Sequence, residues 1–334
     1  MKNITALLLI GTILTSCAPV ITATPGPTDT PTSSSVTPTS SSITPTSSSI
    51  TPTSASITPT APPSVTPAPT SNVQHVFVVV MENHGYDQVW NTSSSPYITS
   101  LGNSYARATN FHALIHPSLP NYLQLYASSN YDITTDCSPS QSCHVSAMSL
   151  ADNLEAKGLT WKAYMESMPS PCYLKNSGDY APKHNPFIYF DAIRNDADRC
   201  NSHVVPYTQF ASDLATAATT PNFAWISPNL CNDMHDCPVS TGDTWLKNNI
   251  PTILNAPACI VDKCLVILTW DEDDNGATNQ VLTIFAGPLA KSGGAASAAS
   301  YTHFNTLHTV ESIYGLPPQT TNDGEALPMS DMLK

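Results

Sequence analysis

The stretch VFVVVMENHGYD, residues 76–87, decides the fold of this chain. Residues 76–81 form an unbroken apolar run rich in valine, which is typical of a strand buried on both faces of an α/β sheet. Glu82, Asn83 and His84 follow directly. Ligands of open α/β sheets gather at the carboxyl ends of strands. Taken alone, this polar strand end fits a ligand site and an ordinary surface loop about equally well.

Further apolar runs alternate with amphipathic segments along residues 73–334, which we interpret as one folded domain. Strands are expected at 76–81, 160–165, 222–226, 264–270 and 281–286, and helices at 96–106, 119–127, 147–157, 207–218, 243–254 and 303–314. This alternation predicts an α/β fold with a mainly parallel sheet covered on both faces. The domain has no glycine-rich phosphate loop and no G-x-S-x-G elbow, which argues against an α/β-hydrolase lipase or esterase.

The first 17 residues have the pattern of an export signal. Lys2 precedes a short apolar run at 6–14, which is too short to span a bilayer, and small residues follow. Residues 14–17, LTSC, resemble a bacterial lipobox, which predicts a lipid-modified Cys17 and an anchor at the cell surface. The alternative is an ordinary secretory signal in which Cys17 has no role.

Residues 18–72 are rich in serine, threonine and proline, and carry SSSVTPT-type repeats with a period of seven. A proline in every repeat excludes a coiled coil. Such a segment has too few apolar residues to compensate the entropy of ordering, so we expect an extended, disordered linker that could carry O-linked sugars.

Eight cysteines lie in the folded domain, and an even number in an exported protein indicates disulfides. Eight cysteines allow 105 pairings. Proximity in sequence favours Cys137–Cys143, Cys231–Cys237 and Cys259–Cys264, which leaves Cys172–Cys200. A zinc-thiolate site is the alternative, but the sequence has no CxxC pair to support it.

The formal net charge is −13, and no basic cluster is present, so the composition excludes a nucleic-acid-binding protein. No protein partner is evident. Four acids, residues 271–274, follow the predicted strand 264–270. If strands 76–81 and 264–270 are neighbours, Glu82, Asn83, Asp271 and Glu272 come together, and their oxygens suit one divalent metal ion such as Mg, Ca, Mn or Zn. The alternative is a solvated acidic turn.

Ser118, in the motif HPSLPNY at 116–122, lies just before a predicted helix. A serine there is commonly an N-cap, but beside a metal its hydroxyl can ionise and act as a nucleophile. His235 lies in a cysteine-flanked loop beyond strand 222–226 and is a candidate proton donor; the alternative is a disulfide-stabilised surface loop. His303, at the start of the last long helix, is either a site residue or a capping residue.

MENHGYD, HPSLPNY, PNLCNDMHDC, TWDEDD, IFAGP and THFNTLHTVESIYGLP together resemble, in order, the phosphoesterase family. This family includes bacterial phospholipases C and acid phosphatases and belongs to the alkaline-phosphatase-like superfamily. The resemblance covers essentially residues 74–317. It implies a three-layer α/β/α sandwich and a metal-dependent phosphate-ester hydrolase.

The resemblance also implies roles for individual residues. Those matching metal ligands are Glu82, Asn83, Asp271 and Glu272, joined by Ser118 as a nucleophile that touches the metal. His235 and His303 match histidines that contact the phosphoryl group or its leaving group, with His116 as a further candidate. Asn279-Gln280 stands where relatives often have a histidine. The motifs contain no evident lysine or arginine, so the metal and the histidines are expected to neutralise most of the phosphate charge.

The function predicted from these features is an exported, acid-phosphatase-like phosphomonoesterase that acts on small phosphate esters through a phosphoserine intermediate. The first alternative is a phospholipase C-type phosphodiesterase, although the domain has no room for the large C-terminal module of the longer phospholipases C. The second is a lipoprotein that binds a phosphorylated ligand without turnover. A binding protein does not need Ser118 as a nucleophile, whereas the enzyme does.

Overall fold

The computed structural model describes residues 75–334 of the chain. The predicted signal at 1–17, the predicted linker at 18–72 and the proposed lipid site at Cys17 lie outside the described residues. Within residues 75–334, no helix combines the length and the apolar character needed to cross a bilayer.

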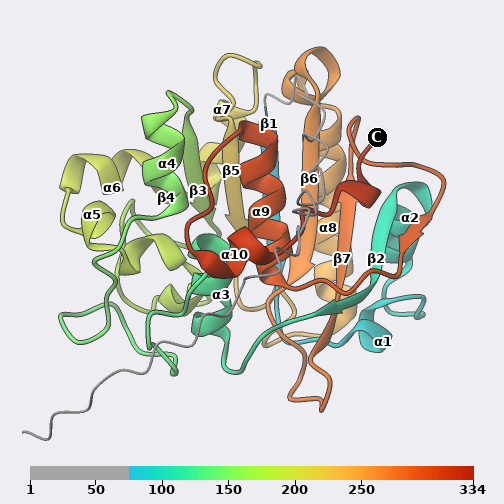
Figure 1. Cartoon of the computed structure of the whole chain (residues 1–334), viewed down its shortest axis with the longest axis horizontal. Helices are drawn as coiled ribbons and strands as arrows, with labels where there is room; N and C mark the ends of the chain where they lie inside the picture. Colours follow the sequence, from blue (N-terminus) through green and yellow to red (C-terminus); the bar gives the residue numbers. More distant parts are fainter. Residues whose placement is uncertain (1–74) are drawn as a thin grey trace, which may run out of the picture. The chain divides into compact units, whose positions relative to one another are not determined.

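An eight-stranded sheet forms the centre of the described domain (Figure 1). Its spatial order is β4-β3-β5-β1-β6-β7-β2-β8, and β7 runs antiparallel to both of its neighbours, whereas the other pairs are parallel. The strands are β1 His75–Met81, β2 Ala106–His112, β3 Trp161–Met165, β4 Val204–Pro206, β5 Phe223–Ser227, β6 Cys264–Trp270, β7 Gln280–Ala286 and β8 Ala295–Ser297.

β1 is an interior strand of the sheet, and all seven of its residues are buried, as the apolar run predicts. It pairs in parallel with β5 on one side and β6 on the other. Met81 is in register with Trp270, so the two strands end at the same level. The polar residues that follow β1 and β6 therefore begin side by side.

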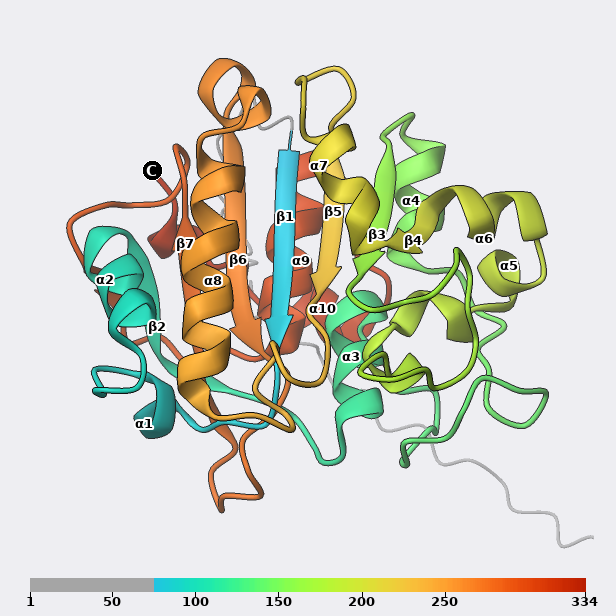
Figure 2. The same cartoon turned by 180° about the vertical axis from the view of Figure 1, so that it is seen from behind.

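Helices cover both faces of the sheet, which gives the predicted α/β/α layers. α9 lies over one face (Figure 1) and α8 over the other (Figure 2). The α-helices are α1 Tyr86–Val89, α2 Pro96–Ser104, α3 Ser118–Ala127, α4 Leu150–Ala156, α5 Asp191–Arg194, α6 Ala197–His203, α7 Phe210–Asp213, α8 Val239–Leu254, α9 His303–Tyr314 and α10 Thr321–Glu325. Short turns of 3₁₀-helix are η1 Pro182–His184, η2 Pro186–Tyr189, η3 Tyr207–Gln209 and η5 Ser330–Met332, and η4 Ala258–Asp262 is a π-helical turn.

Several expected helices differ from the structure. The helix expected at 243–254 begins four residues earlier, at Val239, and the helix expected at 147–157 begins three residues later, at Leu150. The helix expected at 96–106 ends at Ser104, and Ala106 already belongs to β2. β2 is not evident in the sequence because its side chains are only partly buried and its pairing with β7 contains an irregularity. The helix expected at 207–218 is only η3 followed by α7, since residues 215–219 bury no side chain that could anchor a longer helix.

All four predicted disulfides are present in the structure: Cys137–Cys143, Cys172–Cys200, Cys231–Cys237 and Cys259–Cys264. Three of them close short loops, and the fourth links the segment after β3 to α6. Four disulfides in one domain are typical of a protein that folds outside the cytoplasm.

A buried pair of acids joins α9 to α10 and makes stability depend on pH. Glu311 is fully buried, and burial followed by the charge of Asp323 raises its pKa to about 9. Folding therefore favours protonated Glu311, and its contribution to stability is complete below pH 4.5 and is lost as the pH rises toward 9. The substitution Glu311→Gln keeps the shape of the side chain but removes the group that titrates.

We expect Glu311→Gln to match the wild type in unfolding free energy at pH 4 and to exceed it at pH 8, by on the order of 2 kcal/mol. Urea unfolding at the two pH values measures the difference. Glu325→Gln, an exposed glutamate of α10, is the matched control and should have no such pH dependence. An equal change in stability at both pH values would contradict the assignment.

Candidate active site

The carboxyl ends of β1 and β6 bring buried acids together. The Asp271 amide donates to the Met81 carbonyl oxygen at 3.0 Å, which continues the β-ladder one residue beyond the strands. Glu82 and Asp271 are consequently neighbours, and both are fully buried. Glu272, the next residue, is 4% exposed. The acids that follow β6 directly are therefore part of the interior, and the alternative of a solvated acidic turn is wrong for these two.

Ser118 is the first residue of α3 and faces these acids. Its hydroxyl donates to Glu82 Oε2 at 3.2 Å and Glu272 Oε1 at 3.3 Å, and the residue is 1% exposed. The N-cap position belongs to Pro117, and the Asp136 carboxylate accepts from the Leu119 amide of the first turn at 3.0 Å. Ser118 therefore does not serve as the N-cap. Its oxygen lies at the amino end of a ten-residue helix, where the helix dipole favours negative charge.

Asn83 completes the cluster from the β1 end. Its backbone amide donates to Asp271 Oδ1 at 3.4 Å. Its side-chain oxygen faces Glu82 Oε2 and Glu272 Oε1; turning the amide over would instead place its nitrogen 3.1 and 3.2 Å from them as a donor. In either orientation the Asn83 amide lies within 3.2 Å of both carboxylates, and its oxygen belongs to the ligand types that hard divalent ions take.

The electrostatics of the cluster also fit a cation. Burial raises the pKa of Glu82 to about 7, against the opposing effect of His184, and burial raises that of Glu272 to about 7. Burial, followed by the charges of Glu82 and Glu272, holds the pKa of Asp271 well above its usual range. Asp271 Oδ2 is buried without a hydrogen-bond partner. Acids in this state are destabilised as anions unless a positive charge joins them.

The structure therefore brings together all five residues predicted to hold the metal. Carboxylate, amide and hydroxyl oxygens form the donor set, which suits a hard divalent ion. The residues are Glu82, Asn83, Ser118, Asp271 and Glu272.

A second group of ligand-type side chains shares Glu82. His184 Nε2 lies 3.1 Å from Glu82 Oε1, and His184 Nδ1 lies 3.2 Å from Asp233 Oδ2. Burial lowers the pKa of His184 to about 4, so its ring is neutral and able to bind a metal. One ligand atom each of Glu82, His184 and His235 lies within 4.8 Å of the others. This Glu/His/His group is a further candidate for binding a cation.

His235 lies at the outer side of this group in a loop closed by the Cys231–Cys237 disulfide. Its Nδ1 lies 2.6 Å from Asp236 Oδ1, and its Nε2 lies 3.0 Å from Lys183 Nζ. Because an ammonium group only donates, Nε2 accepts, and the ring proton is on Nδ1. The motifs themselves contain no lysine, but the structure places Lys183, from outside them, beside His235.

The other two predicted histidines contact the acids in different ways. His303 is fully buried, and its Nε2 donates to the Asp271 carbonyl oxygen at 2.6 Å. His116 is partly exposed, with Nδ1 2.8 Å from Glu272 Oε2 and Nε2 3.3 Å from Asp273 Oδ1. His303 is thus placed to hold the Asp271 backbone, and His116 to hold the Glu272 carboxylate.

Comparison with known proteins identifies the family. Residues 88–317, more than half of the chain, match the Phosphoesterase family. The chain belongs to the Phosphoesterase family. It is a phosphoric ester hydrolase, as the motifs predict.

This phosphoesterase is similar to proteins of bacteria and fungi. It is 31% identical over 259 residues to a phosphatidylinositol-3-phosphatase of Mycobacterium tuberculosis, covering 77% of this chain and 82% of the relative. It is 29% identical to an acid phosphatase of Aspergillus fumigatus and 30% identical to a probable acid phosphatase of Kluyveromyces lactis, over 75% of this chain in each case. It spans 58% and 60% of those two relatives.

Solved structures confirm the predicted fold of the phosphoesterase. A protein of the alkaline phosphatase superfamily from Vibrio parahaemolyticus superposes with a TM-score of 0.56 at 12% identity, over 80% of this chain and 76% of the other. A murine ectonucleotide pyrophosphatase/phosphodiesterase 5 superposes with a TM-score of 0.55 at 11% identity, over 78% of this chain and all of the other. At these identities the likeness establishes the alkaline-phosphatase-like fold alone.

Three residues of the phosphoesterase site were not found from the sequence: Lys183, His184 and Asp233. Lys183 and His184 belong to η1, a single turn in a long irregular segment between β3 and α5. Asp233 lies two residues before His235 in the motif PNLCNDMHDC, where it does not differ from the other acids of the loop. The one available signal was the adjacent pair Lys183-His184, flanked by prolines, and nothing in its spacing distinguishes it from a surface turn.

Proposed function

We propose that this phosphoesterase is an acid-phosphatase-like phosphomonoesterase that acts outside the cytoplasm, anchored through Cys17, and that forms a phosphoserine on Ser118. The observation that carries the proposal is the buried Ser118 hydroxyl, held at 3.2 and 3.3 Å between two carboxylates at the start of α3. The names of similar proteins, acid phosphatase and phosphatidylinositol-3-phosphatase, also support it, because both names denote enzymes that hydrolyse phosphate monoesters.

The first step forms the bond from Ser118 Oγ to phosphorus and breaks the bond to the leaving oxygen. The carboxylates of Glu82 and Glu272 are in position to accept the Ser118 proton. The positive end of the α3 helix dipole, at which Ser118 lies, favours the negative charge of the phosphoryl oxygens. A divalent ion held by Glu82, Asn83, Asp271 and Glu272 would, when bound, lower the pKa of the Ser118 hydroxyl and neutralise phosphate charge.

The departing oxygen needs a proton, which we assign to the hydrogen-bonded pair Lys183–His235. Lys183 Nζ carries the shared proton, and His235 Nε2 accepts it, so either member can deliver it as the pair rearranges. His303 does not deliver this proton in our proposal, because it is fully buried and its Nε2 donates to the Asp271 carbonyl oxygen. We assign it the role of positioning Asp271. Water then hydrolyses the phosphoserine and restores Ser118.

A substrate panel tests the proposal. We expect kcat/KM for p-nitrophenyl phosphate to exceed that for bis(p-nitrophenyl) phosphate and for phosphatidylcholine by at least about a hundredfold, because a divalent ion held by the acids would reward the dianionic charge of a monoester. Phosphatidylinositol 3-phosphate, included because of the M. tuberculosis relative, separates a lipid monoesterase from a general one. Faster cleavage of phosphatidylcholine or the bis-ester would instead support the phospholipase C-type alternative.

A further inference from the structure

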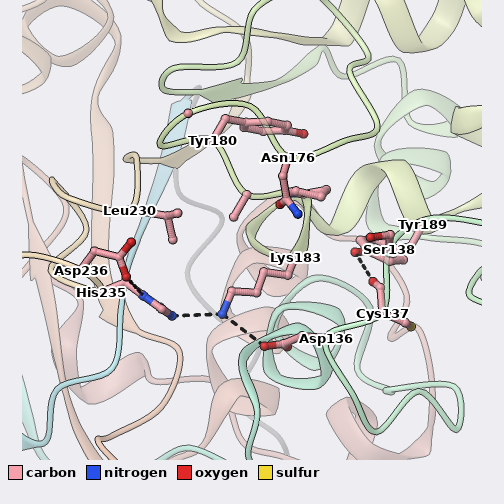
Figure 3. Close-up of a pocket in the computed structure, with 13 residues that line it drawn as sticks. Asp136, Cys137, Ser138, Asn176, Tyr180, Lys183, Tyr189, Leu230, His235 and Asp236 are labelled. Carbon is pink, nitrogen blue, oxygen red and sulfur yellow. Dashed lines mark hydrogen bonds and ion pairs between the residues drawn. The ribbon is translucent and has the colours of Figure 1, made fainter. Parts of the chain in front are cut away.

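A cavity of about 410 Å³ opens next to the proposed active site (Figure 3). Two of its lining residues, Lys183 and His235, also belong to the site. A ring nitrogen of His235 lies within 4.8 Å of a carboxylate oxygen of Glu82, and Glu82 accepts the hydrogen bond from Ser118. The cavity therefore begins on the proton-donating side of the site, where the leaving group departs.

The charges of the lining are largely compensated and leave a negative excess. Lys183 Nζ lies 3.2 Å from Asp136 Oδ2, so its positive charge is already paired. Asp236, also in the lining, holds His235 Nδ1 at 2.6 Å. Two carboxylates against one ammonium disfavour a second anionic group on the substrate. The cavity suits a neutral occupant.

The lining also offers polar groups that are open to solvent. Asn176 and Ser138 are exposed, and Figure 3 shows both around the cavity. An amide and a hydroxyl can each donate and accept. Together with the free oxygen of Asp236, they form a set that can bind several hydroxyl groups at once.

Two tyrosines, Tyr180 and Tyr189, form the buried wall behind the lining. The Tyr180 hydroxyl donates to the Tyr173 carbonyl oxygen at 2.8 Å, and the Tyr189 hydroxyl donates to that of Cys137 at 2.7 Å. Both residues are at most 3% exposed, so their hydroxyl groups and rings are already in contact with the protein. The groups that an occupant can reach are therefore the amide, the hydroxyl and the carboxylate, which match a molecule with several hydroxyl groups.

We propose that this cavity binds the leaving group of the substrate and selects a neutral polyhydroxylated alcohol, such as a sugar or a cyclitol. The inference rests on the proposed phosphomonoesterase function and specifies its substrate class. Asn176 and Ser138 are specificity residues in this assignment, since they contact the alcohol and not the phosphoryl group.

Three matched esters test the assignment through phosphate release from the full chain. Glucose 6-phosphate and cyclohexylmethyl phosphate share a six-membered ring and one CH₂ group before the ester oxygen, and differ mainly in hydroxyl groups. We expect kcat/KM for glucose 6-phosphate to be at least about tenfold higher, because a site built for hydroxyl groups loses its hydrogen bonds with the analogue. Glucose 1,6-bisphosphate, with a second anionic group, should be a poorer substrate than glucose 6-phosphate.

The double variant Asn176→Ala/Ser138→Ala should reduce the ratio between glucose 6-phosphate and cyclohexylmethyl phosphate about tenfold, mainly through a higher KM for the sugar ester. Asn248→Ala, an exposed asparagine of α8 outside the cavity lining, is the matched control and should leave the ratio unchanged. Equal kcat/KM for the two ring esters, or a preference for the bisphosphate, would overturn the assignment.

The outcome also separates this inference from the function on which it rests. If p-nitrophenyl phosphate is hydrolysed but the hydroxyl groups give no advantage, only the cavity assignment fails. If no monoester is hydrolysed at all, the phosphomonoesterase proposal fails, and the cavity assignment fails with it.

Discussion

Ser118→Ala is expected to lower kcat for p-nitrophenyl phosphate at least about a thousandfold, because the variant has no oxygen to receive the phosphoryl group. The fold should persist, since the Ser118 hydroxyl does not cap α3 and the bond from the Leu119 amide to Asp136 at the start of the helix is retained. Loss of the hydroxyl removes its bonds to Glu82 and Glu272, both of which keep other neighbours. Circular dichroism and thermal unfolding check the fold, and initial rates check the activity.

Two further measurements make the Ser118 prediction specific. Acid quenching during turnover, followed by mass spectrometry, should locate phosphate on Ser118 in the wild type. Ser100→Ala, an exposed serine of α2, is the matched control and should retain full activity. Wild-type rates for Ser118→Ala would exclude the phosphoserine mechanism and would favour a binding role for the residue.

Removal of divalent metal is the second change expected to have a large effect. We expect exhaustive chelation to abolish activity and to lower the melting temperature by several degrees, because the buried acids lose their compensating charge. A ligand present at about 100 times its dissociation constant stabilises a fold by about 2.7 kcal/mol. Adding back Mg, Ca, Mn or Zn separately should restore both properties and identify the preferred ion.

Asp271→Asn tests which residues hold the ion, because it keeps the shape of a buried ligand and removes its charge. The variant should bind less metal by elemental analysis and should gain little thermal stability from added ions. Asp274→Asn, in the exposed part of the same acidic run, is the matched control and should bind metal as the wild type does. Full activity after exhaustive chelation would exclude a metal at Glu82, Asn83, Ser118, Asp271 and Glu272.

Local sequence patterns were reliable where burial is complete. β6 has the predicted bounds because seven successive residues are buried, and α9 has them because Thr302 begins the helix and Gly315, with a φ of 64°, ends it. β2 was missed and the helix at 207–218 was overestimated, since both segments bury only some of their side chains. Partial burial weakens the periodicity on which such predictions depend.

The sequence by itself determined the central strands, three of the disulfides and the acids at two strand ends, because each is encoded in residues that are close along the chain. The fourth disulfide, Cys172–Cys200, joins residues 28 positions apart and was predicted only by elimination. The stretch VFVVVMENHGYD predicts both a buried strand and a polar end, whatever the rest of the chain does. Only the tertiary structure decided which distant residues meet that end. The parallel pairing of β1 with β6 brings Asp271 to Glu82, and η1 brings Lys183 and His184 to the same place. Irregular loops have no periodicity that could reveal these contacts, so they follow from packing alone.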